Sequence, residues 1–228
     1  RDIDIAAEVD SWEEFARLAE RLDERRGVHK FIVVDAEVDV VPYGGVERED
    51  RTILWPDDHE MNVLGLREAV ESADTALLPD GVSVRVPSIP ALALLKLFAW
   101  RDRHRDDTRD AIDLAVIIAW YSSAHYLDRL YDEGFDVLEQ FDYDPPLAGA
   151  FLLGRHMTDL LDDEAVAVLS EVVGNQDLMG RLARDMAAVR GPALVAAMGD
   201  GIRDAAAGPA DLTRRTPGSG RRSGAGSA

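Results

Sequence analysis

The chain of 228 residues contains no cysteine, which excludes disulfides and thiolate metal sites. It has no apolar run long enough to span a bilayer and no recognisable secretory signal, so we expect a cytoplasmic protein with no membrane partner. The five histidines lack the spacing of a zinc protease site, and no Walker loop, Gly-x-Ser-x-Gly or Gly-x-Gly-x-x-Gly motif is present. Carboxylates and single cations are left as the candidate chemical groups.

Lysine is scarce, because Lys30 and Lys96 are the only lysines among 25 basic residues. Acidic residues number 44, and the formal net charge is −19. A surface of that sign argues against broad, non-specific binding to nucleic-acid backbones, which needs a cationic surface. It remains compatible with a local cationic pocket.

The pattern of apolar residues predicts an α+β fold in three parts. Residues 1–87 mix strand and helix signals, and residues 88–206 have helical periodicity throughout. Residues 207–228 are rich in glycine, serine and arginine, a composition typical of disorder. We therefore expect an α+β domain, a helical domain and a disordered tail.

The first part is expected to begin with a strand over residues 2–9 and an amphipathic helix capped by Ser11. Two β-branched stretches follow between residues 30 and 43, and Gly44-Gly45 closes them. The other elements expected here are a strand over residues 51–55, a helix over 66–73 and a hairpin over 75–86 with Asp80-Gly81 at its turn.

The helical part is expected to begin at Ser88, with Pro90 in the first turn of its helix. A second helix begins near Thr108. Three or more further helices are expected over residues 126–206, with breaks at 144–146, at 174 and at 191–192.

Acidic residues interrupt two apolar strands of the first part: Asp2 and Asp4 lie two apart, and Asp39 lies in the later strand. Residues i and i+2 of a strand share a face, so these charges repel each other without a cation. If the two strands are neighbours, the three carboxylates meet, and a hard ion such as Mg²⁺ is their natural partner. Two such ions would activate a hydroxyl and stabilise a leaving pyrophosphate. The simpler alternative is that acids at strand ends are solvated.

Lys96 lies in the apolar helix "LALLKLFAW", although nearly every other cation of the chain is arginine. Arg103 lies seven residues on and shares its side of the helix. The two would form a positive stripe facing the carboxylates, with a triphosphate between them. The alternative is that the Lys96 stem crosses apolar surface and its ammonium reaches water.

The next helix begins with "RDAIDL", which places Arg109, Asp110 and Asp113 in its first turns. Acids at a helix N-terminus are favourable in themselves, and Arg109 and Asp113 have the i,i+4 spacing of an ion pair. Beside Lys96, the same residues fit a network that orients the basic groups.

Four segments, "RDID", "VDVVPYGG", "LLKLFAWRDR" and "RDAIDL", resemble in this order the AbiEii-type nucleotidyltransferases. These are toxins of bacterial toxin–antitoxin and abortive-infection systems, within the DNA polymerase β-like superfamily. The resemblance covers about residues 1–122, and the remainder is similar only in being helical.

The resemblance implies a nucleotidyltransferase-like mixed sheet in which Asp2, Asp4 and Asp39 hold catalytic Mg²⁺. It implies that Lys96 contacts the nucleotide phosphates and that the helix starting at Arg109-Asp110 completes the pocket. The implied reaction moves a nucleoside monophosphate from an NTP to a hydroxyl, with the tRNA 3′ end as acceptor class and an antitoxin as partner. A small molecule or a protein hydroxyl is the alternative acceptor, and the tail arginines 214, 215, 221 and 222 are a candidate basic arm for tRNA.

The family also places a glycine motif upstream of the Asp-x-Asp pair, where backbone amides hold the triphosphate. That segment would precede Arg1, so the second expectation is a truncated, non-catalytic module for nucleotide binding or protein interaction. A third, a metal-dependent phosphohydrolase, would use the same carboxylates without a nucleotide pocket.

Overall fold

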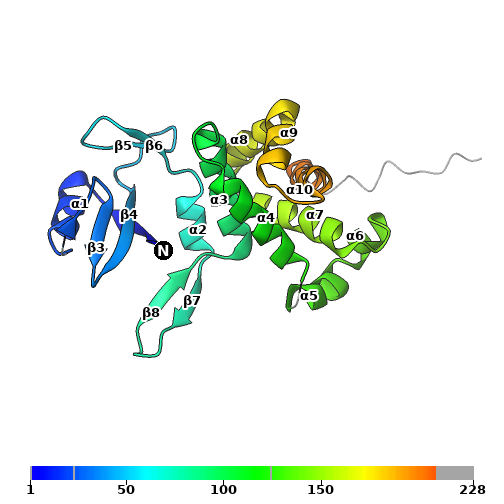
Figure 1. Ribbon diagram of the computed structural model, residues 1–228, viewed down its shortest axis with the longest axis horizontal. Helices are drawn as coiled ribbons and strands as arrows, with labels where there is room; N and C mark the ends of the chain where they lie inside the picture. Colours follow the sequence, from blue (N-terminus) through cyan, green and yellow to red (C-terminus); the bar gives the residue numbers. More distant parts are fainter. Residues whose placement is uncertain (1, 23, 124, 209–228) are drawn as a thin grey trace, which may run out of the picture.

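The computed structural model describes residues 2–22, 24–123 and 125–208 of the protein. The predicted α+β class is confirmed: small sheets lie at the N-terminal side and helices form the rest (Figure 1). The predicted tail lies almost entirely outside the described residues, as do its four arginines. The domain boundaries expected from the sequence stay a prediction.

A four-stranded sheet forms the N-terminal end of the molecule, in the order β1-β4-β3-β2. Strand β1 is parallel to β4, and helix α1 and strands β2 and β3 lie between them in the chain. Neighbouring strands β4, β3 and β2 are antiparallel. The bounds are β1 (Asp2–Val9), α1 (Trp12–Ala19), β2 (Glu24–Arg25), β3 (Lys30–Val33) and β4 (Ala36–Gly44).

Local chemistry accounts for this start of the fold. The Ser11 side chain accepts a hydrogen bond from the Glu14 amide, as expected of an N-cap. Alternation along β4 buries Val38 and Val40 on one face, which packs with Phe31 of β3 into a first hydrophobic cluster. Asp39 is left on the other face.

Helix α2 (Leu66–Glu71) connects this sheet to the helical part of the chain. It packs on both β4 and α3 and lies between them in Figure 1. Arg51 fastens it, since its guanidinium donates to both oxygens of buried Glu68 on α2, at 2.9 and 3.1 Å, and to Glu47 at 2.8 Å. Glu47 in turn accepts from the Gly44 amide at the end of β4.

Two small hairpins flank α2. The predicted strand at 51–55 and the predicted hairpin are confirmed, with Gly81 in the left-handed conformation at the turn. Strands β2 and β6 were not predicted, since β2 has two residues and β6 lies in a polar stretch that pairs only across its hairpin. The bounds are β5 (Thr52–Leu54), β6 (Glu60–Asn62), β7 (Asp74–Leu77) and β8 (Ser83–Val86).

Eight helices follow in the described chain and enclose a second hydrophobic cluster. The expected start at Ser88 is confirmed, since its side chain accepts from the Ala91 amide. None of the described helices combines the length and the apolar character needed to cross a membrane. The bounds are α3 (Ile89–Arg103), α4 (Arg109–Tyr121), α5 (His125–Glu133), α6 (Phe135–Gln140), α7 (Pro145–Thr158), α8 (Asp163–Gly174), α9 (Gln176–Asp185) and α10 (Gly191–Ala206).

Helices α7 and α10 make the most extensive contact in the helical part, and glycine permits it. A Cβ on Gly201 of α10 would collide with the backbone carbonyl of Phe151 on α7. A Cβ on Gly154 of α7 would collide with the carbonyl of Met198 on α10. The two backbones therefore approach each other more closely than any residue with a side chain would allow.

We expect Gly201→Ala to lower the free energy of unfolding by about 2–3 kcal/mol, because the added methyl forces α7 and α10 apart. Urea denaturation of the variant measures this loss. The matched control is Gly180→Ala in α9, where the nearest atom to a new Cβ is the mobile end of Arg184 at 3.7 Å. That change should be neutral or stabilising by about 0.5–1 kcal/mol, and equal losses in the two variants would contradict the packing argument.

Candidate functional site

The register of β1 on β4 brings acidic positions together. Asp4 lies opposite Asp39, and Asp2 lies opposite Glu37. Partners in a parallel ladder share a face, so position 39 adjoins position 4, and the two-residue period adds positions 2 and 37. The side chain of Asp2 lies outside the described part of the structure. The sequence did not single out Glu37, whose place follows from the register alone.

The Asp39 carboxylate is unusual in having one oxygen without a partner. Its side chain is only 15% exposed, and Oδ2 accepts a hydrogen bond from the Lys30 ammonium at 3.0 Å. Oδ1 is buried and has no hydrogen-bond partner among the described residues. A buried acceptor left unsatisfied is costly, and such atoms in a native fold often mark a ligand site.

Among the described side chains, Lys30 contributes a positive charge to this face. It lies opposite Asp39 in the β3–β4 ladder, and its ammonium bridges Asp39 and Glu37, the latter at 3.1 Å. The hydrogen bonds that Lys30 donates to Asp39 and to Glu37 raise the pKa of Lys30. In the sequence, Lys30 stands out only because lysine is rare. Its position at the start of the strand that precedes the Asp39 strand was the available signal.

His29 borders the same carboxylate. Its Nε2 lies 4.0 Å from Asp39 Oδ2, and its ring packs on Trp55 with 5.4 Å between ring centroids. Burial lowers the pKa of His29 and outweighs the opposing charge of Asp39. The lowered pKa favours the neutral imidazole, so His29 borders the Asp39 carboxylate as an uncharged ring and not as a second positive charge.

The chemistry of these side chains fits a hard divalent cation. Asp4 and Asp39 offer carboxylate oxygens from adjacent strands. Oδ1 of Asp39 accepts no hydrogen bond from the described residues and is therefore available to coordinate a cation. No group of three or more potential ligands occurs among the described side chains. The resemblance implies Asp2 as the third ligand, and the side chain of Asp2 lies outside the described part of the structure.

A second polar cluster joins α3 and α4 around Asp110. This carboxylate is 1% exposed, and its two oxygens accept separately from Lys96 at 3.3 Å and from Arg103 Nε at 2.6 Å. Lys96 also donates to Asp113 at 2.6 Å. The structure thus brings Lys96, Arg103 and Asp110 together as predicted, but each cation is already paired with a carboxylate.

Arg109 has a different setting. Its side chain is 83% exposed and forms its ion pair with Asp107 at 2.6 Å, just before α4 begins. The hydrogen bonds from Arg109 lower the pKa of Asp107 to about 2. The i,i+4 pair of Arg109 with Asp113 suggested by the sequence is replaced by the Lys96–Asp113 bond.

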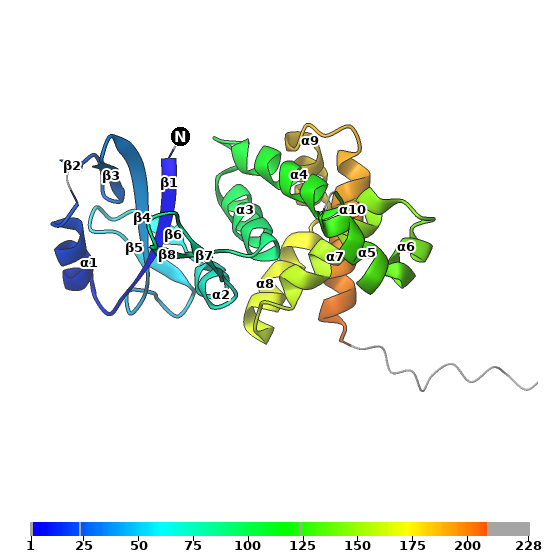
Figure 2. The same cartoon turned by 90° about the horizontal axis from the view of Figure 1, so that it is seen from below.

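Strand β4, which carries Asp39, and helix α3, which carries Lys96 and Arg103, both contact α2. In Figure 2 the start of β1 and the loop between α3 and α4 both lie toward the upper edge of the molecule. The elements that carry the two clusters are therefore linked through α2.

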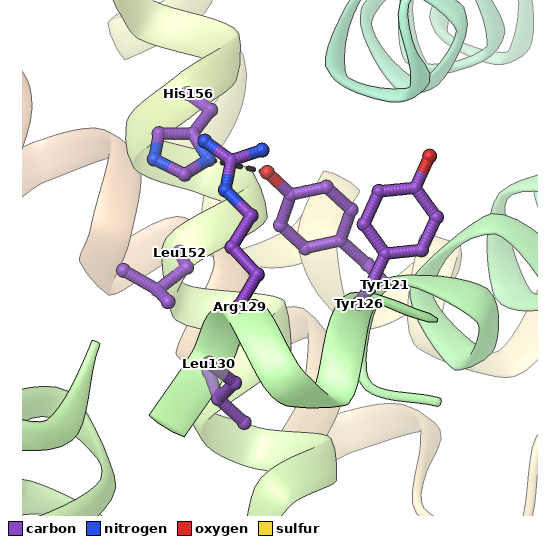
Figure 3. Close-up of a pocket in the computed structure, with 6 residues that line it drawn as sticks. All are labelled: Tyr121, Tyr126, Arg129, Leu130, Leu152 and His156. Atoms are coloured by element: carbon purple, nitrogen blue, oxygen red, sulfur yellow. Dashed lines mark hydrogen bonds between the residues drawn. The ribbon is translucent and has the colours of Figure 1, made fainter. Parts of the chain in front are cut away.

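Aromatic side chains form a further pocket between α4, α5 and α7 (Figure 3). The Tyr121 hydroxyl is hydrogen-bonded to His156 Nδ1, and Tyr126 stacks on Tyr121 with ring centroids 5.4 Å apart. The Arg129 side chain lies beside them in Figure 3. These contacts fasten α5 to its neighbours, far along the chain from the carboxylate face.

The comparisons with known proteins agree with the motifs. A family described as "Nucleotidyl transferase AbiEii toxin, Type IV TA system" has a model that matches residues 1–190. The match corrects the narrower range of 1–122, since it also takes in helices α5 to α9. No curated protein and no solved structure matched the chain.

We expect Lys96→Met to lower the free energy of unfolding by about 1–3 kcal/mol, because buried Asp110 then keeps one of its two cations. Burial lowers the pKa of Lys96, but the hydrogen bond that Lys96 donates to Asp113 and the charges of Asp110 and Asp113 outweigh it, so the pKa is raised above 10.5. A raised pKa gives stabilisation that is complete below the ordinary value and is lost only as pH rises through the folded value. The loss should therefore be equal at about pH 6 and about pH 9 in urea denaturation.

Arg48→Met is the control, since Arg48 and Glu60 form an exposed pair at 3.1 Å. It should cost less than about 1 kcal/mol. A loss in Lys96→Met as small as that in the control would mean that Asp110 does not depend on its lysine.

Proposed function

The chain belongs to the AbiEii nucleotidyltransferase toxin family, and from that premise we propose that it moves a nucleoside monophosphate from an NTP to a hydroxyl acceptor with the help of Mg²⁺. The observation that carries the proposal is the open Oδ1 of Asp39, buried on the face where Asp39 lies opposite Asp4. This oxygen lacks a partner that a divalent cation would supply.

Asp2, Asp4 and Asp39 would hold the ion in this proposal. When bound, such an ion supplies Lewis-acid activation of the attacking hydroxyl and charge stabilisation for the departing pyrophosphate. The protein's own contribution is to keep the carboxylates of two strands in register. Without the cation they would repel each other, which favours the bound state.

Asp39 is also the proposed acceptor of the hydroxyl proton, through the carboxylate oxygen that the ion does not occupy. The acceptor oxygen forms a bond to the α-phosphorus, the bond from that phosphorus to the bridging oxygen breaks, and pyrophosphate leaves. The apolar wall of His29 and Trp55 keeps water from the neighbouring side of the carboxylate.

Lys96 and Arg103 are proposed to bind the phosphates by directed hydrogen bonds. Asp110 takes one donor from each, and an ammonium has three donors and a guanidinium five. Because the Asp110 carboxylate is buried, its two hydrogen bonds hold both cations in place, and their remaining donors stay available for phosphate oxygens. Arg109 and Asp107 would complete the rim of the pocket at the start of α4.

A tRNA 3′ end is the proposed acceptor, and an antitoxin protein is the proposed partner, both on the strength of the family. The net charge of −19 favours contact with a short single-stranded end over contact with a long nucleic-acid surface. A protein or small-molecule hydroxyl is the alternative acceptor that the same charge permits.

We expect Asp39→Asn to reduce label transfer from α-³²P-labelled NTPs to tRNA by about 100-fold or more, since the amide is a poor metal ligand and no base. The four NTPs are tested in turn with Mg²⁺, with tRNA and with the chain itself as acceptors. The control is Asp35→Asn, an exposed residue at φ 64° that asparagine also tolerates, and it should retain full transfer.

Two outcomes would contradict the transferase proposal. Release of free phosphate from the NTP without label on any acceptor would favour the phosphohydrolase. No binding of any NTP to the folded chain, measured by isothermal titration, would favour the non-catalytic module for protein interaction.

A further inference from the structure

We propose that Lys30 is a counter-ion which selects the metal–nucleotide complex over the free metal ion, and that Glu37 holds Lys30 when Asp39 is released. The inference rests on the proposed function, because it concerns the same carboxylate face. It assigns a role to two residues outside the carboxylate triad.

The ammonium of Lys30 lies beside the place that the cation would take on Asp39. It lies 3.0 Å from Oδ2 of Asp39 and comes from the neighbouring strand, where it faces Asp39 in the ladder. A free divalent ion that approaches Asp39 is repelled by this charge. At such distances one unit charge changes an affinity by roughly tenfold, for an effective dielectric between those of protein and water.

A metal–triphosphate complex carries net negative charge, so the sign of the interaction reverses. The carboxylate face repels that complex, whereas Lys30 attracts it. One lysine therefore weakens binding of the free ion and strengthens binding of the ion with its nucleotide. This order of binding avoids a metal-filled site that lacks substrate.

Glu37 gives the lysine a second position. Its carboxylate accepts from Lys30 at 3.1 Å and its side chain is half-exposed, whereas Asp39 is mostly buried. When Asp39 turns to a metal, the ammonium keeps Glu37 and water as partners. The lysine therefore leaves Asp39 without becoming an unpaired buried charge.

The test measures binding of Mn²⁺ by electron paramagnetic resonance, with and without the α,β-methylene analogues of ATP, GTP, CTP and UTP. We expect Lys30→Gln to bind free Mn²⁺ about 5–10-fold more tightly than the wild type and the Mn²⁺–analogue complex more weakly. Arg48→Gln is the matched control, since it removes one exposed cation elsewhere in the same part of the fold, and it should change neither affinity by more than about twofold.

A double-mutant cycle tests the part played by Glu37. Glu37→Gln should weaken free Mn²⁺ binding, because Lys30 then stays on Asp39, and the loss should shrink when Lys30 is already glutamine. Equal losses in both backgrounds would overturn the role of Glu37. Circular dichroism melts of each variant show that it is folded.

The outcomes separate this inference from the proposed function. Binding of Mn²⁺ that Asp39→Asn abolishes but Lys30→Gln leaves unchanged or weakens would overturn the inference alone. Absence of Mn²⁺ binding by the wild type, with every analogue, would overturn both.

Discussion

The parallel pairing of β1 with β4 is the constraint on which the candidate site depends. It sets Asp4 directly opposite Asp39, a placement that mutual repulsion disfavours. On the opposite face of the pair, Val9 of β1 is buried in the same hydrophobic cluster as Val38 and Val40 of β4, and a slip of β1 by one residue would turn Val9 away from this cluster. Hydrophobic burial on one face therefore holds the charged groups of the other face in position, and Lys30 offsets part of their repulsion.

The helical part organises its polar groups by the opposite means. Asp110 is buried and carries one cation on each oxygen, so Lys96, Arg103, Asp110 and Asp113 together are close to neutral. This cluster offers donors with fixed directions, in contrast to the positive stripe expected from the sequence. Compared with a positive stripe, a neutral cluster would attract a triphosphate less over long distances. Its hydrogen-bond donors have fixed directions and would orient a triphosphate better at contact.

Most of the elements could be predicted from the sequence, because their causes are local. Ser11 and Ser88 cap their helices, and Gly81 permits the left-handed turn of its hairpin. Strands β2 and β6 could not be predicted, since their only support is the partner strand across a hairpin. The membership of α5 to α9 in the family match was equally invisible, because those helices carry no motif with its own chemistry.

The sequence by itself determined which residue types are available: acids within apolar strands, two lysines, and a helix that opens with Arg109-Asp110. These follow from composition and from periods of two and of 3.6 residues, which need no distant partner. Only the tertiary structure decided the pairings, because an ion pair between strands or helices depends on register and packing. In the folded chain Lys30 pairs with Asp39 and Glu37, and Lys96 pairs with Asp110 and Asp113. One buried oxygen of Asp39 has no hydrogen-bond partner among the described residues.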